Sequence, residues 1–226
     1  MSVDRRFVLK SMVLGGAAGV VLSRSVPVLA GVPPSHSGIR PALALVGSGA
    51  AEAAFLQGAR AAAGTELPVQ QMDRGLDCML DFEHQLRAGR PMQVIGLLDD
   101  AAATLVLDLA RSAGARVHWL GQHTAEAGST RHRLLNADLA EGCARQLSRH
   151  LHACGAGFTL NEERQGSVAP ARQLAGPARS GAGSVQWAAG IGSLLATLGT
   201  RPTMMPRVSV QGTLLSGSFV SFSIEV

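Results

Sequence analysis

The chain has 226 residues, of which 46% are hydrophobic and 16% are charged, so it can bury a core and is not disordered throughout. The formal net charge of +4 is concentrated near the N-terminus, where Arg5, Arg6, Lys10 and Arg24 face only Asp4. Without this segment the chain is close to neutral, and it contains no Tyr and six Phe. The sequence therefore offers neither a basic surface nor an aromatic ladder for nucleic acid, and we expect no nucleic-acid binding.

The first thirty residues have the pattern of an export signal. Residues 4–10 read DRRFVLK, and a mildly apolar, Gly-rich run occupies residues 11–22. This segment resembles a twin-arginine (Tat) signal peptide, whose pattern is Ser/Thr-Arg-Arg-x-Phe-Leu-Lys. The resemblance implies that the Tat export machinery binds Arg5 and Arg6 and that cleavage follows Ala30. It also implies that the folded protein reaches the periplasm.

The apolar run of residues 11–22 is too short to span a bilayer as a stable transmembrane helix. An uncleaved amphipathic helix or a membrane anchor is the alternative to a cleaved signal. Because the twin-arginine route carries folded proteins, the resemblance implies folding in the reducing cytoplasm. Cys78, Cys143 and Cys154 are accordingly expected to be buried thiols and not a disulfide framework.

Strand and helix patterns alternate between residues 41 and 121. Four buried apolar runs predict strands, at residues 41–46, 67–72, 94–98 and 117–120. Runs with helical spacing predict helices between them, at residues 50–63, at residues 76–86, and from Asp99-Asp100 to a stop at Gly114. This alternation predicts an α/β fold, with a mostly parallel, three-layer, flavodoxin-like or Rossmann-like sheet of strand order 2-1-3-4. We expect residues 31–226 to form one domain.

The second half of the chain is less regular. A long helix is predicted over residues 131–153, a mobile loop at about residues 164–184, and an apolar helix over residues 185–198. Residues 207–214 and 219–226 have the pattern of a C-terminal β-hairpin on the edge of the sheet. If its outer strand is unpaired, that strand offers a docking edge to another protein.

The turn Gly47-Ser48-Gly49 follows the first predicted strand and opens a helix, and Asp73 ends the second strand. These are features of a dinucleotide-binding fingerprint, but Glu52 replaces the third glycine of that pattern. A carboxylate at this position would repel a pyrophosphate. Two other interpretations remain open, a tight turn that leads into a helix and a turn that binds another anion or a polar ligand.

Ligands of open α/β sheets bind outside the carboxyl ends of the strands. This rule brings six candidate ligand-binding residues to one edge, namely Ser48, Gly49, Asp73, Asp99, Asp100 and His123. Asp99 is also placed to cap the helix that follows it. The two adjacent aspartates and His123 could alternatively act as an acid and a base, or ligate a divalent metal.

The order of elements over residues 41–123 includes FLQGA in a helix, Asp73 after a strand, and VIGL before Asp99-Asp100. In this layout the segment resembles one lobe of a periplasmic sugar-binding-type protein. The leading hypothesis is an exported, non-catalytic α/β protein that binds a small ligand or a partner protein. The alternative is a periplasmic enzyme, or an accessory subunit of a cofactor-containing enzyme, with an Asp/His site at the same edge. The sequence indicates no particular cofactor.

Overall fold

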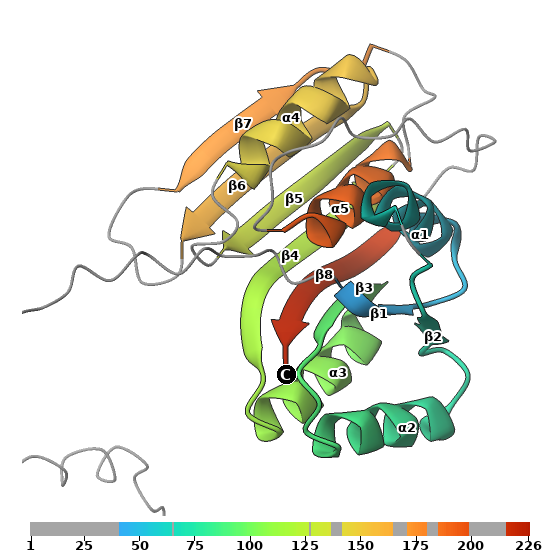
Figure 1. The fold of residues 1–226 in the computed structure, drawn as a ribbon. Helices are drawn as coiled ribbons and strands as arrows, with labels where there is room; N and C mark the ends of the chain where they lie inside the picture. The colour runs from blue at the N-terminus through green and yellow to red at the C-terminus, as the bar shows by residue number, and fades with distance from the viewer. Residues whose placement is uncertain are drawn as a thin grey trace, which may run out of the picture. The chain divides into compact units, whose positions relative to one another are not determined.

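The structure is a computed structural model that describes residues 41–64, 66–126, 128–136, 142–164, 171–179, 185–198 and 216–226. The chain divides into two units, residues 1–35 and 36–226. The described residues belong to the second unit and form eight strands and five helices of an α/β fold (Figure 1). The predicted export signal, including Arg5 and Arg6, lies outside the described residues.

The first half of this unit alternates strands and helices, as predicted. Its elements are β1 (Pro41–Val46), α1 (Ala50–Ala63), β2 (Val69–Gln71), α2 (Leu76–Arg87), β3 (Gln93–Asp99), α3 (Asp100–Ser112) and β4 (Arg116–Glu126). The bounds of β1 and α1 are the predicted ones. β4 continues well beyond its apolar run because residues 121–126 still alternate between buried and more exposed positions, which is the period of a strand.

The second half differs from the prediction. Its elements are β5 (Ser129–Asn136), α4 (Cys143–Ala153), β6 (Gly157–Arg164), β7 (Arg172–Gly176), α5 (Gln186–Ala196) and β8 (Gly217–Glu225). The long helix predicted over residues 131–153 is wrong, because its first part is β5 and only its last part is helical. β7 lies inside the stretch 164–184, which was expected to be a mobile loop.

All eight strands form one mixed sheet in the order β2-β1-β3-β8-β4-β5-β6-β7. β1 is parallel to β2 and β3, and β5 is parallel to β6, but β8 is antiparallel to both of its neighbours. The predicted mostly parallel order 2-1-3-4 is therefore wrong. β3 and β4 do run in the same direction, which fits their connection through α3, but β8 separates them.

The C-terminal strand lies inside the sheet and not at its edge. Phe219 of β8, for example, is paired with Asp99 of β3 on one side and with His123 of β4 on the other. The predicted edge position is wrong because both sides of β8 already carry a ladder of hydrogen bonds. The strand expected to pair with it, residues 207–214, lies outside the described residues.

Helices cover both faces of the first half of the sheet (Figure 1). α2 and α3 pack against one face of β1, β3 and β8, and α1 and α5 pack against the opposite face, while α4 lies beside α5 over β6 and β7. In β5, Thr130, His132 and Leu134 are buried on the side of α4 and α5, whereas Arg131 and Arg133 are exposed. The predicted three layers are thus found around the first half of the sheet, while β5 has one exposed face.

The three cysteines are free thiols, as predicted. Cys78, Cys143 and Cys154 form no disulfide, although only Cys78 is fully buried. Burial raises the pKa of the Cys143 thiol to about 12, so this side chain is not a reactive thiolate at neutral pH.

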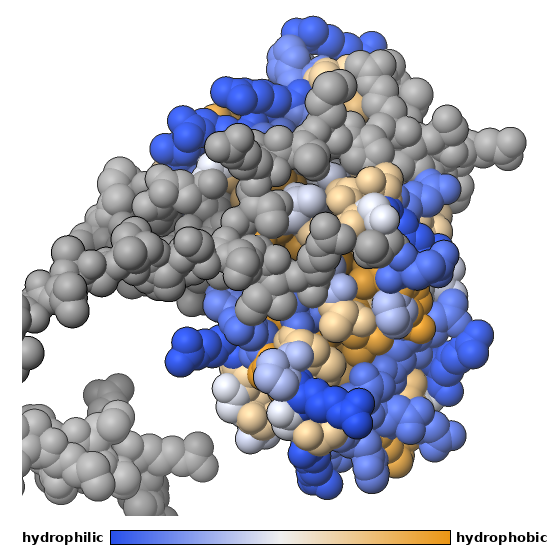
Figure 2. Space-filling view, viewed as in Figure 1, coloured by the Kyte–Doolittle hydropathy of each residue, from blue (hydrophilic) through white to orange (hydrophobic). Residues whose placement is uncertain are grey.

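Figure 2 shows polar side chains over much of one face, with apolar side chains between them. Among the residues that the structure describes, the large apolar side chains that are exposed are Leu76 and Leu80 on α2 and Leu105 on α3. None of the helices in the described ranges is long and apolar enough to cross a membrane. The apolar run of residues 11–22 lies outside these ranges.

Two glycines allow α1 and α5 to pack backbone to backbone. A Cβ atom on Gly58 would lie 1.9 Å from the carbonyl oxygen of Ala189, and one on Gly192 would lie 2.0 Å from that of Phe55. Only residues without a side chain permit this close approach. The contact fixes the position of α5, which carries the buried Trp187, above the sheet.

We expect Gly58→Ala to destabilise the protein by about 2 kcal/mol or more, since the new methyl group would collide with a backbone oxygen that cannot rotate away. This loss outweighs the gain in helix propensity of about 1 kcal/mol. Gln57→Ala, an exposed change in the same helix, is the control and should change stability by less than about 0.5 kcal/mol. Urea unfolding of both variants measures the difference. Equal stability of Gly58→Ala and wild type would contradict the helix contact.

Candidate functional site

The ends of β2, β1 and β3 meet at one edge of the sheet, which we call the carboxyl edge. Val46, the last residue of β1, is paired with Gln71 of β2 and Leu97 of β3, so the segments that follow these strands lie side by side. The backbone N–H of Ser48 donates a hydrogen bond to Oδ2 of Asp73 at 3.0 Å. The structure thus brings together the turn after β1 and the acidic residue after β2.

Glu52, in the first turn of α1, turns its carboxylate back over this turn. A Cβ atom on Gly49 would lie 2.5 Å from Oε2 of Glu52, and one on Gly47 would lie 3.1 Å from Oε1. The two glycines therefore leave space for a carboxylate. Because that carboxylate lies against the turn, the site is unfavourable for a pyrophosphate, and the dinucleotide interpretation gains no support.

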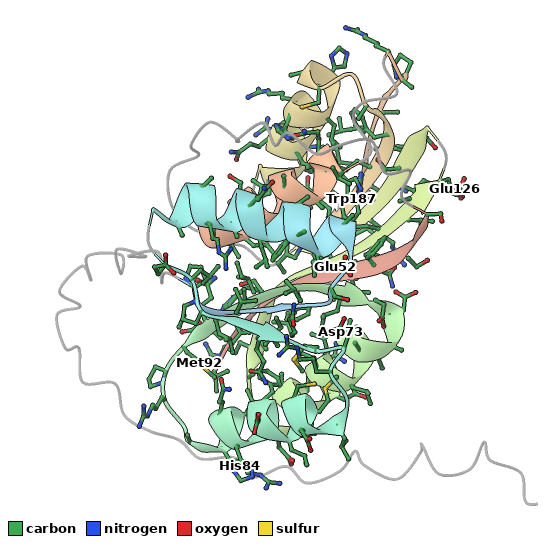
Figure 3. All side chains as sticks on the ribbon, turned by 90° about the vertical axis from the view of Figure 1, so that its right-hand side faces the viewer. Glu52, Asp73, His84, Met92, Glu126 and Trp187 are labelled. Atoms are coloured by element: carbon green, nitrogen blue, oxygen red, sulfur yellow. The ribbon has the colours of Figure 1, made fainter. Side chains whose placement is uncertain are left out.

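The carboxylate of Glu52 is buried without full compensation. The residue is 6% exposed, and its Oε2 has no hydrogen-bond partner among the described residues. Burial raises the pKa of Glu52 and is the largest effect. The hydrogen bond from its own backbone N–H lowers the pKa, and the charges of Asp99 and Asp73 add smaller increases. Figure 3 shows Glu52 and Asp73 on the same side of the molecule, at the carboxyl edge.

The three aspartates of the predicted site have different surroundings. Hydrogen bonding from Ser48 lowers the pKa of Asp73, which is exposed. Asp99 is the N-cap of α3, and its Oδ1 accepts a hydrogen bond from the backbone N–H of Ala102 at 2.8 Å. Asp100 lies exposed in the first turn of α3, where its charge faces the positive end of the helix dipole. The carboxyl edge is therefore acidic.

His123 lies in the core and not at the carboxyl edge, where the sequence predicted it. It belongs to β4 and is 1% exposed. His123 and Asp99 are both paired with Phe219, so they lie at one level of the sheet but two strands apart. Nδ1 of His123 lies 2.9 Å from Nδ1 of His132, and its Nε2 lies 2.7 Å from Oγ of Ser221. The structure therefore forms no Asp99–His123 acid–base pair.

The polar contacts of His123 belong to a chain of buried hydrogen bonds. The Trp119 indole N–H can only donate, and it donates to Oγ of Ser221 at 2.8 Å. We assign the Ser221 hydroxyl as donor to Nε2 of His123, and Nδ1–H of His123 as donor to Nδ1 of His132. Nε2–H of His132 donates to Oγ1 of Thr130 at 2.9 Å, and that hydroxyl donates to a backbone carbonyl of β6. In this direction every hydroxyl and ring N–H of the chain has an acceptor.

Trp187 of α5 packs against both imidazoles, with ring centroids 5.0 Å from His123 and 5.5 Å from His132. Burial lowers the pKa of His132 to about 3. Burial, and secondarily the neighbouring His132, also lower the pKa of His123 well below its usual value. Both histidines are therefore neutral at physiological pH.

A serine that donates to a histidine is one half of a nucleophilic site, but the environment here does not suit catalysis. Ser221 is fully buried in the middle of a strand, and its Oγ already accepts a hydrogen bond from Trp119. A substrate cannot reach it in this structure. The chain of hydrogen bonds instead joins β8, β4 and β5 beneath α5, and we interpret it as a structural network.

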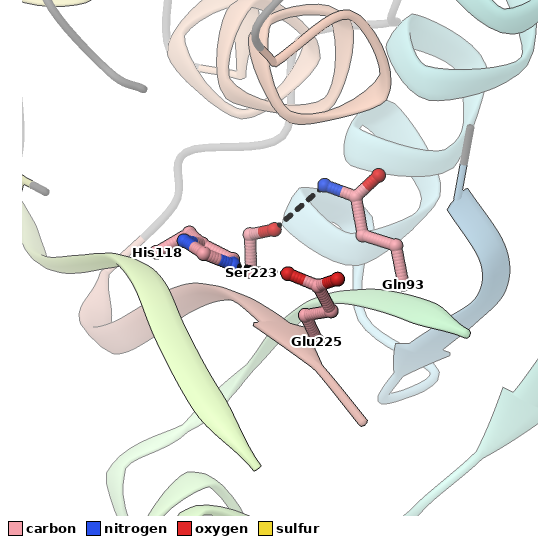
Figure 4. A network of polar contacts seen from close by, with 4 residues as sticks. All are labelled: Gln93, His118, Ser223 and Glu225. Carbon is pink, nitrogen blue, oxygen red and sulfur yellow. Dashed lines mark hydrogen bonds and ion pairs between the residues drawn. The ribbon is translucent and has the colours of Figure 1, made fainter. Parts of the chain in front are cut away.

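A second polar group lies at the opposite end of β3 (Figure 4). Nε2 of Gln93 donates to Oγ of Ser223 at 3.0 Å, and His118 forms an ion pair with Glu225 at 2.8 Å. His118 is partly buried at the start of β4. These contacts hold β8 in register between its neighbours, away from the carboxyl edge.

Two further features bear on what the protein could bind. Within the described ranges, no group of three or more His, Cys, Asp or Glu side chains is arranged to hold a metal ion. A pocket of about 380 Å³ lies where β5 and β6 begin and β7 ends, and Thr130, Arg131 and Phe158 contribute to its walls. None of the six predicted site residues lines this pocket.

Compared with known proteins, the chain matches no protein family, no curated protein and no solved structure. The function of the site is therefore inferred from the residues of this chain alone. The sequence analysis did not include Glu52 among the candidate site residues, although it follows the Gly47-Ser48-Gly49 turn closely in the sequence. It also missed His132 and Ser221, for which the alternation of polar and apolar residues in each strand was the available signal.

The pair His123–His132 predicts a loss of stability in acid. The pKa of each imidazole is lower in the folded chain than the value of about 6.5 in an unfolded chain. The unfolded state therefore binds more protons below pH 6.5, and stability falls from there toward the folded pKa, by up to about 1.4 kcal/mol per pH unit for each histidine. Urea unfolding between pH 7 and pH 5 measures this slope.

The variant His132→Asn should have a flatter pH profile than wild type, whereas His84→Asn, at an exposed position on α2, should keep the wild-type slope. A wild-type free energy of unfolding that stays constant from pH 7 to pH 5 would contradict the buried neutral pair.

Asp99→Ala should cost about 1 kcal/mol of stability, because it removes the acceptor for the backbone N–H of Ala102. Asp99→Asn keeps an acceptor at the N-cap and removes the charge, so we expect it to stay near wild-type stability. Thermal unfolding of the two variants separates the cap from the charge. An equal loss in both would show that the charge, and not the cap, stabilises the helix.

Proposed function

We propose that the protein is exported and non-catalytic, and that it binds a small ligand at the carboxyl edge of β2, β1 and β3. The observation that carries the proposal is the carboxylate of Glu52, buried beside Asp73 and Asp99 with an oxygen that lacks a partner among the described residues. A buried polar atom without a partner is costly, and a ligand that supplies the missing hydrogen bond offsets this cost. The edge also lies where ligands of open α/β sheets bind.

The position of β8 favours a small ligand over a partner protein docked on a C-terminal hairpin. Docking by strand addition needs an unpaired edge, and β8 is paired with β3 and β4 along its length. The enzyme alternative needs His123 near Asp99 and Asp100, but His123 is held in the core by His132 and Ser221. The geometry therefore supports neither alternative as well as it supports ligand binding.

Export is proposed from the twin-arginine pattern at Arg5 and Arg6 and the signal-like run that follows.

Native mass spectrometry of protein recovered from the periplasm tests both parts of the proposal. We expect a polypeptide that begins at Gly31 and carries a bound small molecule. Asp73→Asn should lose the ligand, because it removes a charge at the edge while its amide oxygen can still accept from Ser48. Asp81→Asn, exposed on α2, is the matched control and should keep the ligand.

A bare polypeptide in wild type would contradict ligand binding. A mass increased by a second polypeptide would favour the accessory-subunit alternative. An intact N-terminus at Met1 in the cytoplasmic fraction would contradict export with cleavage.

A further inference from the structure

We propose that the ligand of the carboxyl edge is an organic ammonium ion and that Glu52 is the residue that binds its charge. The inference rests on the proposed function, because it names the chemical class of ligand for the same site. It is carried by the burial of Glu52, by its unpartnered Oε2, and by the two aspartates that face it.

The first step concerns Glu52 itself. The side chain is more than nine-tenths buried, and its carboxylate lies against a turn whose two glycines provide the space for it. In either protonation state Oε2 lacks a partner among the described residues, since a carboxylate oxygen needs a donor and a carboxylic acid needs an acceptor. The turn thus holds a polar group that the described part of the chain leaves unsatisfied.

The second step concerns charge. Asp73 after β2 and Asp99 at the end of β3 both repel the charged form of Glu52, and burial adds to this, so the pKa of Glu52 is raised. A bound cation removes the repulsion and donates to Oε2 at the same time. A neutral polyol would supply only the hydrogen bond, and an anion would be repelled.

The third step distinguishes an organic cation from a metal ion. A metal ion needs several ligand atoms around one point, and the side chains within the described ranges do not form such a group. An ammonium group needs only directed acceptors at hydrogen-bond distance, and several separated carboxylates can share it or bind two such groups of one ligand. The acidic edge therefore fits ammonium groups better than a single metal ion.

Helix capping leaves Oε2 of Glu52 unexplained. The carboxylate faces the positive end of the helix dipole and accepts a hydrogen bond from its own backbone N–H, but Oε2 still has no partner among the described residues. The N-cap residue Gly49 contributes no side-chain hydrogen bond, and the carboxylate of Glu52 is withdrawn from solvent between the turn and the core. Such withdrawal costs stability and needs a reason beyond the helix.

Isothermal titration calorimetry of the mature protein, beginning at Gly31, tests the inference. The probes are propylamine, 1,4-diaminobutane and spermidine, matched by the neutral 1-propanol and 1,4-butanediol. We expect at least one amine to bind ten-fold or more tightly than its matched alcohol.

The variant Glu52→Gln should lose at least ten-fold in affinity for that amine and melt no lower than wild type at pH 7, since it removes the repulsion between Glu52 and the two aspartates. Glu66→Gln, at an exposed position before β2, is the matched control and should bind like wild type. Full affinity in Glu52→Gln would overturn the role of Glu52.

The remaining outcomes separate this inference from the proposed function. If periplasmic protein carries an Asp73-dependent ligand but none of the amines binds, or the amines bind no better than the alcohols, the ammonium class is overturned and the ligand site stands. If no probe binds and the periplasmic protein is bare, both the inference and the proposed function are overturned.

Discussion

The double pairing of β8 is the interaction on which the rest of the structure depends. β8 is antiparallel to β3 on one side and to β4 on the other, and it joins the parallel strands of the first half to the strands of the second half in one sheet. Ser221 and Ser223 point toward the side of α5, where Ser221 links Trp119 to His123 and Phe219 packs against Trp187. Val220, Phe222 and Ile224 pack on the side of α2 and α3. Both faces of this strand are therefore buried.

The hydrogen-bond chain around His123 and the carboxylate of Glu52 are two buried polar features that differ in how far their hydrogen bonds are satisfied. The chain from Trp119 to Thr130 is satisfied from end to end and keeps two histidines neutral, so it stabilises a unique packing of α5 on the sheet. Glu52 is buried without such satisfaction, beside like charges. Proteins retain unsatisfied groups of this kind chiefly where function needs them, which is why the carboxyl edge and not the histidine chain is the better candidate for a ligand site.

Local patterns predicted the first half of the fold well because each strand there is an apolar run and each helix has a clear period. They failed from His123 onward, where β4 and β5 carry polar residues on one face and bury histidines on the other, so that residues 131–136 were assigned to a helix. The place of β8 depends on pairing between residues far apart in the chain, which no local pattern contains. At the site, the topology rule gathered Ser48 and Asp73, but the role of Glu52 depends on the direction in which its side chain turns.

The central place of a strand from the far end of the sequence also has a consequence for the order of folding. During synthesis β3 and β4 leave the ribosome long before β8, so the first half of the sheet and the hairpin of β4 and β5 each carry an open strand edge in the meantime. The contacts that close these edges are among the most non-local in the chain, and such contacts form slowly. The nascent protein is therefore exposed to aggregation until its last strand arrives, and completion of the sheet coincides with completion of the chain up to β8.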